Sequence, residues 1–132
     1  EHDRSGMEGI YASVAQIVAR TIRSFDDAYF MGKGEYLLVL KHVEFMDACA
    51  VMDRLRGEIE TTPVFLQDGK KVGISLSCGI AEALQREEPD VALQNAKTAL
   101  EQARGDGGNR VVEFRETSAL EQYARDVNKG GA

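Results

Sequence analysis

The sequence predicts a single α+β domain, an α/β sandwich in which helices cover a mostly antiparallel sheet. Amphipathic segments alternate with pairs of short apolar segments, and glycine-containing turns join each pair. The chain has 132 residues with 43% hydrophobic content, which suits one core. The predicted order is helix, hairpin, helix, hairpin, helix and strand, an alternation typical of a sheet covered by helices.

Three amphipathic segments predict helices over residues 10–22, 44–60 and 90–104, because their apolar residues recur at helical spacing. Thr61-Thr62-Pro63 ends the second helix, and the glycine-rich stretch 105–108 ends the third. A weaker helical pattern covers residues 116–127 and precedes a glycine-rich end.

Two hairpins and a final strand complete the predicted sheet. Residues 28–31 and 36–40 are strand-like, and Gly32-Lys33-Gly34 between them supplies positive-φ positions for a tight turn. Asp68-Gly69 joins residues 64–66 to a strand over 72–81, and 109–114 is the last strand. Residues 36–40 are apolar on both faces, so we expect them to lie centrally in a covered sheet.

Composition excludes several classes of function. The net charge is −6 and no run of Lys or Arg occurs, which argues against sequence-independent binding of nucleic acid. No apolar stretch approaches the roughly 18 residues that span a bilayer, so the sequence predicts a soluble domain without a membrane partner. Cys49 and Cys78 lack metal-ligand spacing and are predicted to be buried thiols in a reducing cytosol. The chain begins at Glu1, which suggests a piece of a longer protein.

Four segments together resemble the GGDEF, or diguanylate cyclase, family in the family's own order. Residues 31–40, Met-Gly-Lys-Gly-Glu-Tyr-Leu-Leu-Val-Leu, resemble the signature "Y-GGDEF-LVLL" with three of its five letters changed. Residues 75–81 resemble "TxSxGxA", residues 96–110 resemble "ADxALYxAK…GRNRV", and residues 10–22 resemble "VLxxVAxxL". The chain is therefore identified as the C-terminal three-quarters of a degenerate GGDEF domain.

The resemblance implies a fold and a domain division. The family fold is similar to the palm of nucleotide cyclases, a central and mostly antiparallel sheet wrapped by helices. Residues 1–115 would form the degenerate GGDEF domain, with the family's first strand missing from the chain, and residues 116–132 a C-terminal helix and tail.

The resemblance also implies that the catalytic site has decayed. Family members hold GTP and Mg²⁺ with carboxylates and with the backbone of the signature hairpin, but the metal-binding acid of the signature falls on Gly34 here. Lys33 replaces the second glycine, and the family's phosphate-binding Lys and Arg fall on Arg104 and Gly108. Glu35 alone does not make such a site, so we predict no catalysis, no metal and no cofactor. The degenerate signature, Gly32, Lys33, Gly34, Glu35 and Tyr36, is interpreted as an ordinary hairpin turn.

A regulatory site is predicted to survive. Many members carry an inhibitory site for cyclic-di-GMP built on an RxxD motif that ends five residues before the signature, and Arg23 and Asp26 stand at that spacing. Arginine pairs with phosphate or with the Hoogsteen edge of guanine, and aspartate accepts hydrogen bonds from guanine. The second arginine of the site falls on Arg54, with Arg56 as a weaker alternative. In the alternative, purely structural interpretation, Arg23 is a helix-end cation and Asp26 is a capping or turn carboxylate.

Three functions follow as hypotheses. The leading one is a catalytically inactive receptor for cyclic-di-GMP, a regulatory ligand, that signals by forming a homodimer or by docking a partner protein. The second is an interaction scaffold that binds no nucleotide. The third is a residual diguanylate cyclase that works beside an intact partner domain. By family, we expect a bacterial cytoplasmic protein with a receiver or other sensory domain upstream.

Overall fold

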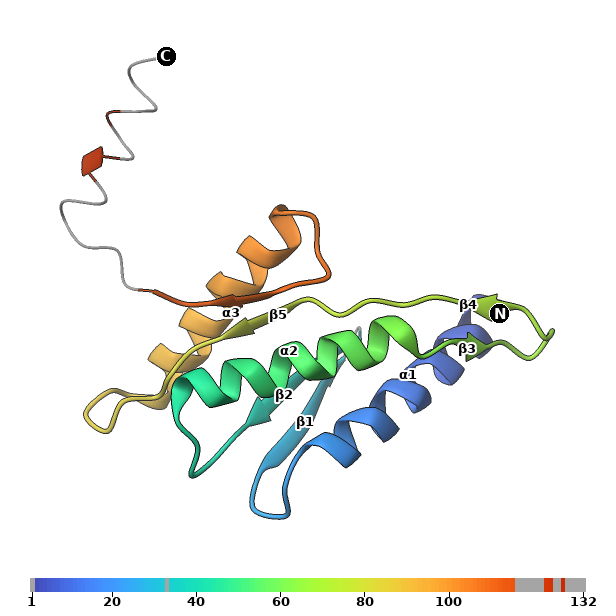
Figure 1. Ribbon diagram of the computed structural model, residues 1–132, viewed down its shortest axis with the longest axis horizontal. Coiled ribbons are helices and arrows are strands. Elements are labelled where there is room, and N and C mark those ends of the chain that lie inside the picture. The colour runs from blue at the N-terminus through green and yellow to red at the C-terminus, as the bar shows by residue number, and fades with distance from the viewer. Residues whose placement is uncertain (1, 33, 116–122, 125–126, 128–132) are drawn as a thin grey trace.

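The computed structural model describes residues 2–32, 34–115, 123, 124 and 127 (Figure 1). The α+β class and the predicted order of elements are confirmed, while the helix predicted over residues 116–127 lies mostly outside the described residues. The elements in chain order are α1 (His2–Thr21), β1 (Asp27–Gly32), β2 (Glu35–Val39), α2 (Phe45–Thr61), β3 (Val64–Phe65), β4 (Lys71–Val72), β5 (Cys78–Ile80), α3 (Pro89–Gly105) and β6 (Val111–Glu113).

α2 and α3 begin and end close to the predicted positions, and α1 ends close to its predicted end. The last helical residue of α2 is Thr61, two residues before Pro63, and α3 begins at Pro89, where the fixed φ of proline suits a first helical turn. The start predicted for α1 is wrong, because the helix begins at His2 rather than near Ile10. Apolar spacing marks where a helix is buried, and the polar first turns of α1 carry no such signal.

The strands form three separate two-stranded sheets. β1 and β2 make the predicted antiparallel hairpin, with Ala28 opposite Leu38 and a bulge after Phe30. β3 and β4 make the second predicted hairpin around Gly69, whose φ is +85°. β5 and β6 pair in parallel, which accords with the long connection through α3.

Two predictions about the sheet are wrong. Residues 72–81 are not one strand: Pro63 and the end of α2 leave β3 only two residues to pair with β4, and the chain forms a ladder again only at β5. β2 is not central either, because within the described part of the chain it pairs with β1 alone. Its side chains are accordingly half-buried, except for the exposed Val39.

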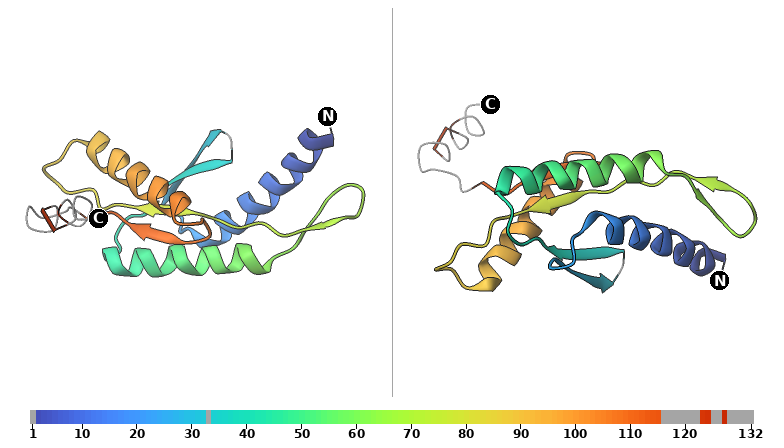
Figure 2. Two further views of the ribbon diagram at one scale, coloured as in Figure 1. Left: turned by 90° about the horizontal axis from the view of Figure 1, so that it is seen from above. Right: turned by 60° about the horizontal axis from the view of Figure 1, so that its bottom comes forward.

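The core lies between the helices and the strands. Leu55 and Ile59 of α2, each 1% exposed, pack with Ile17 and Val18 of α1. The β5–β6 pair lies between α2 and α3 (Figure 2). At Gly79 in β5, an added Cβ would lie 2.2 Å from the carbonyl oxygen of Ala96 in α3, so only glycine allows this approach. This packing fixes α2 as the wall on which the candidate site is built.

Candidate functional site

Asp26 is a buried carboxylate in the short loop between α1 and β1. Its side chain is 1% exposed. The backbone amide of Arg23 donates to Oδ2 at 2.9 Å and the amide of Lys41 donates to Oδ1 at 2.8 Å. The Arg23 guanidinium adds bonds from Nε to Oδ2 at 3.1 Å and from Nη2 to Oδ1 at 3.4 Å. Asp26 therefore joins the end of α1 to the segment after β2.

These bonds determine the charge of Asp26. Burial by itself raises the pKa of this carboxyl group, but the two backbone amides and the Arg23 guanidinium outweigh burial and lower the pKa to about 2. Asp26 is therefore ionised at neutral pH. With four bonds, both oxygens are fully used, since a carboxylate has roughly four acceptor positions. In this arrangement Asp26 caps the turn, as the purely structural interpretation of this residue predicts. An additional hydrogen bond from guanine to Asp26 would require the Arg23 guanidinium to release the carboxylate.

Arg23 is held in place but remains accessible. Besides Asp26, its Nη2 donates to the carbonyl oxygen of Lys41 at 2.6 Å, and its Cζ lies 4.5 Å from the centre of the Phe25 ring. Phe25 in turn makes an edge contact with His42 at 5.4 Å between ring centres. The Arg23 side chain is nonetheless 43% exposed. The protein thus orients a guanidinium that solvent, or a ligand, can still reach.

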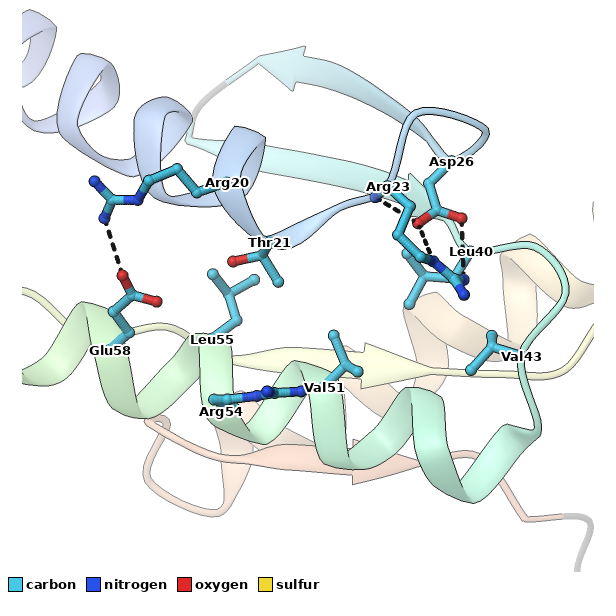
Figure 3. Close-up of a pocket in the computed structure, with 10 residues that line it drawn as sticks. All are labelled: Arg20, Thr21, Arg23, Asp26, Leu40, Val43, Val51, Arg54, Leu55 and Glu58. Atoms are coloured by element: carbon cyan, nitrogen blue, oxygen red, sulfur yellow. Dashed lines mark hydrogen bonds and ion pairs between the residues drawn. The ribbon is translucent and has the colours of Figure 1, made fainter.

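A pocket of about 350 Å³ brings the three predicted residues together (Figure 3). We call it the arginine pocket; it is lined by Arg20, Thr21, Arg23, Asp26, Leu40, Val43, Val51, Arg54, Leu55 and Glu58. Its volume lies at the lower end of the range of about 300–1,000 Å³ for small-molecule sites. Aliphatic side chains from α2 and from the segment after β2 form much of the wall, and arginines from α1, from the loop and from α2 surround them.

The two candidates for the second arginine differ clearly. Arg54 lines the pocket, is exposed, and forms no ion pair with any residue that the structure describes. Arg56 does not line it: its Nε donates to Asp53 at 2.8 Å and its Nη1 donates to Asn109 at 3.1 Å. Geometry therefore favours Arg54, while its ligand role stays a prediction.

The signature hairpin has a different character. Gly32 and Gly34 have φ values of +90° and +75°, and Lys33 lies outside the described residues. A Cβ added to Gly34 would lie 3.1 Å from Cε1 of Tyr11, whose ring packs against this turn from α1. Tyr36 donates a long hydrogen bond of 3.4 Å to the Tyr11 carbonyl oxygen. A side chain at the position of the signature's acid would thus be in tight contact with an aromatic ring.

The remaining signature carboxylate is paired. Glu35 Oε2 lies 3.5 Å from Nη2 of Arg104 in α3, the residue on which the family's phosphate-binding Lys falls. Among the described residues, no three His, Cys, Asp or Glu side chains are grouped so that they could hold a metal ion. Glu35 and Arg104 therefore form an exposed ion pair between the hairpin and α3.

Comparison with protein families identifies the chain. The family described as "Diguanylate cyclase, GGDEF domain" matches residues 8–110. This protein is a GGDEF-family domain. The match includes α1 from Glu8 onward, both hairpins and α3, so the resemblance of the four segments is confirmed.

Curated relatives of this GGDEF domain are named as diguanylate cyclases. It is 28% identical over 104 residues to diguanylate cyclase A of Treponema denticola, a match that covers 78% of this chain and 28% of that protein. It is 28% identical over 102 residues to diguanylate cyclase DosC of Escherichia coli, covering 77% of this chain and 22% of that protein. The chain spans less than a third of the length of either relative.

Solved structures share the fold. The GGDEF domain of DgcB from Caulobacter crescentus, solved in complex with c-di-GMP, has a TM-score of 0.76 at 19% identity, covering 81% of this chain and 64% of that one. The GGDEF domain of TpbB (YfiN) from Pseudomonas aeruginosa has a TM-score of 0.78 at 20% identity, covering 94% and 70%. The cyclase-like α+β fold is thereby established.

In the described part of the chain, no helix has the length and apolar character needed to cross a bilayer.

The two cysteines of this GGDEF domain lie away from the arginine pocket. Both are free thiols, and both are half-buried rather than fully buried as predicted. Burial raises the pKa of Cys78 to about 12, and burial together with a contact to Glu113 raises that of Cys49 to about 11. Such thiols stay protonated at neutral pH, as expected for packing residues.

The sequence did not predict three residues that shape the arginine pocket or the signature hairpin. Arg20 and Glu58 line the pocket, and Tyr11 covers Gly34. Only Arg20 carried a usable signal, because it is a second arginine three residues before Arg23. Glu58 and Tyr11 reach their positions through packing between distant segments.

Proposed function

We propose that this protein is a catalytically inactive GGDEF domain that binds cyclic-di-GMP in the arginine pocket and acts as its receptor. One observation carries the proposal: Arg23, Asp26 and Arg54, named from motif spacing, lie on the wall of one pocket. Arg23 and Arg54 are 31 positions apart in sequence (54 − 23) and belong to different elements. A chance occurrence of an RxxD pair would give no reason for Arg23 and Arg54 to lie in one pocket.

The pocket has the chemistry that a guanine dinucleotide needs. Arginine guanidinium groups form paired hydrogen bonds with phosphate oxygens or with the Hoogsteen edge of guanine, and Arg23 and Arg54 are both accessible for this. Leu40, Val43, Val51 and Leu55 offer apolar surface against which a base can lie. Asp26 acts as a positioning residue, because its bonds to Arg23 fix where that guanidinium points.

Three features of the signature hairpin support catalytic inactivity. The position of the metal-binding acid is a glycine, a side chain there would meet Tyr11, and Glu35 is paired with Arg104. Phosphoryl transfer depends on metal ions and on positioned charge, so these changes remove what the reaction needs most. We therefore assign the inherited fold to ligand binding rather than to turnover.

The output of binding would be a change in assembly. A dinucleotide on an exposed pocket can bridge two protein surfaces, so we propose dimerisation or docking of a partner protein as the response. The named relatives are more than three times longer than the matched segment, which fits a regulatory domain attached to upstream sensory segments. A bacterial cytoplasmic setting is part of the same proposal.

Isothermal titration with cyclic-di-GMP tests the proposal. We expect micromolar or tighter binding by the wild type, loss of about 100-fold or more in Arg23→Ala, and a smaller loss in Arg54→Ala. Arg56→Ala is the matched control, since it removes the same charge from α2 outside the pocket and should leave affinity unchanged. GTP with Mg²⁺ should yield no cyclic-di-GMP. Unchanged affinity in Arg23→Ala would refute the site, and dinucleotide production would refute inactivity.

A nucleotide-free scaffold is the second candidate, and one observation favours it. The β1 strand exposes Tyr29, Phe30 and Met31, each at least 50% accessible, beside the signature turn. Exposed aromatic and Met side chains are frequent at protein interfaces. No thermal stabilisation by any guanine nucleotide would support this candidate over the receptor.

A further inference from the structure

A second ion pair crosses the arginine pocket. Nη2 of Arg20, in the last turn of α1, lies 2.9 Å from Oε1 of Glu58 in α2. The pair stands on the opposite side of the pocket from the Arg23–Asp26 pair, as Figure 3 shows. Both residues line the pocket, so a ligand that fills it would reach them.

The two ion pairs differ in how easily they exchange. Asp26 is 1% exposed and held by backbone amides, whereas the Arg20 and Glu58 side chains are 65% and 42% exposed. Exposed ion pairs contribute little to stability because water competes with them. A guanidinium bound to phosphate through two hydrogen bonds is a stronger arrangement. Arg20 can therefore leave Glu58 for a phosphate at small cost, and Asp26 cannot be separated from its amides so easily.

The charges of the pocket also indicate that Arg20 can exchange Glu58 for an anionic ligand. Its described lining holds three arginines and two acids. Asp26 is committed to Arg23 and to backbone amides, so Glu58 is the carboxylate that an anionic ligand meets. A cyclic dinucleotide carries two phosphodiester charges, and Glu58 both repels them and holds one of the cations that would bind them.

We propose that Arg20 is a further ligand-binding residue of the arginine pocket and that Glu58 competes with the ligand for it. This inference rests on the proposed function. A phosphate oxygen of the bound dinucleotide replaces the Glu58 carboxylate on Arg20, and the exchange breaks an ion pair between α1 and α2. Glu58 thus lowers the affinity of the pocket for the ligand. Ligand binding also removes a contact between α1 and α2.

A double-mutant cycle, measured by titration with cyclic-di-GMP, tests the exchange. Arg20→Ala should weaken binding about 10-fold and Glu58→Gln should strengthen it about 3- to 10-fold. In the double variant the gain from Glu58→Gln should shrink, because no arginine is left to release and only the loss of repulsion remains. Arg110→Ala and Glu44→Gln make the same charge changes outside the pocket and should bind as the wild type. Thermal unfolding of each variant checks that it is folded.

Each other outcome is distinct. If Arg20→Ala and Glu58→Gln bind as the wild type while Arg23→Ala does not bind, the exchange is refuted and the receptor function stands. If Glu58→Gln strengthens binding equally without Arg20, Glu58 acts only as a repulsive charge and the competition is refuted. If the wild type itself does not bind, the proposed function fails, and the inference fails with it.

Discussion

The signature hairpin and the arginine pocket lie on the same domain, but they differ in backbone shape and in how their charges are arranged. The hairpin keeps its shape, with positive φ at Gly32 and Gly34, and its charge is altered. Glu35 forms an exposed ion pair with Arg104, and the Tyr11 ring lies against the place of the acid. The pocket keeps its charge: three arginines surround an apolar wall, and one of them is oriented by a buried carboxylate. A retained backbone shape is therefore weak evidence of chemistry, and a retained arrangement of charges is stronger.

The largest expected effect comes from Asp26→Asn, which breaks the pocket side of this comparison. The asparagine amide keeps one acceptor oxygen but turns its NH2 group toward the backbone N–H of either Arg23 or Lys41, so buried hydrogen bonds are lost. We expect a loss of about 2–4 kcal/mol in the free energy of unfolding, measured by urea denaturation. Binding of cyclic-di-GMP should weaken as well, because Arg23 loses its orientation. Wild-type stability in this variant would show that the network is not structural.

A smaller effect is expected at the hairpin from Gly34→Asp, which restores an acid to the signature. The positive φ and the nearby Tyr11 ring should cost about 1–3 kcal/mol of stability. Because Lys33 and Gly108 still depart from the family's pattern, GTP with Mg²⁺ should still give no cyclic-di-GMP. Tyr11→Ala in the same chain should recover part of the stability and none of the activity. A stable and active Gly34→Asp variant would contradict the account of the hairpin.

The smallest effect is a dependence on pH that belongs to the pocket. The folded pKa of Asp26, about 2, lies below its ordinary value of 3.8. Its contribution to stability is therefore fully present above about pH 4 and is lost as the pH falls through 2. The stability difference between the wild type and Asp26→Asn should shrink between pH 4 and pH 2 in thermal or urea unfolding. A constant difference over that range would show that Asp26 is not the titrating group.

Helix positions and turns could be predicted from the sequence because they depend on neighbouring residues. Pro63, Pro89 and Asp68-Gly69 act through local backbone geometry, and the helices and hairpin that they delimit are confirmed. Strand pairing could not be predicted in the same way. Whether residues 72–81 pair with β3 or β6 depends on how many partner residues each offers, which is a property of the folded chain.

The same division between local and long-range information applies to the candidate site. Motif spacing placed Arg23, Asp26 and Arg54, and the structure brings them to one pocket. Spacing could not show that four hydrogen bonds already occupy Asp26, nor that Glu58 comes from α2 to hold Arg20. The Glu58 contact depends on the packing of α1 against α2, and the Lys41 amide reaches Asp26 only after the β1–β2 hairpin has formed.

The most direct test is to observe which region a nucleotide perturbs. Backbone amide resonances of the ¹⁵N-labelled protein would be followed by NMR during titration with cyclic-di-GMP and, separately, with GTP and Mg²⁺. We predict that cyclic-di-GMP shifts the amides of Arg23, Asp26, Lys41 and Arg54, that Gly32 and Gly34 do not move, and that GTP leaves both regions unchanged. Shifts centred on Gly32 and Gly34, with the arginine pocket silent, would contradict the account.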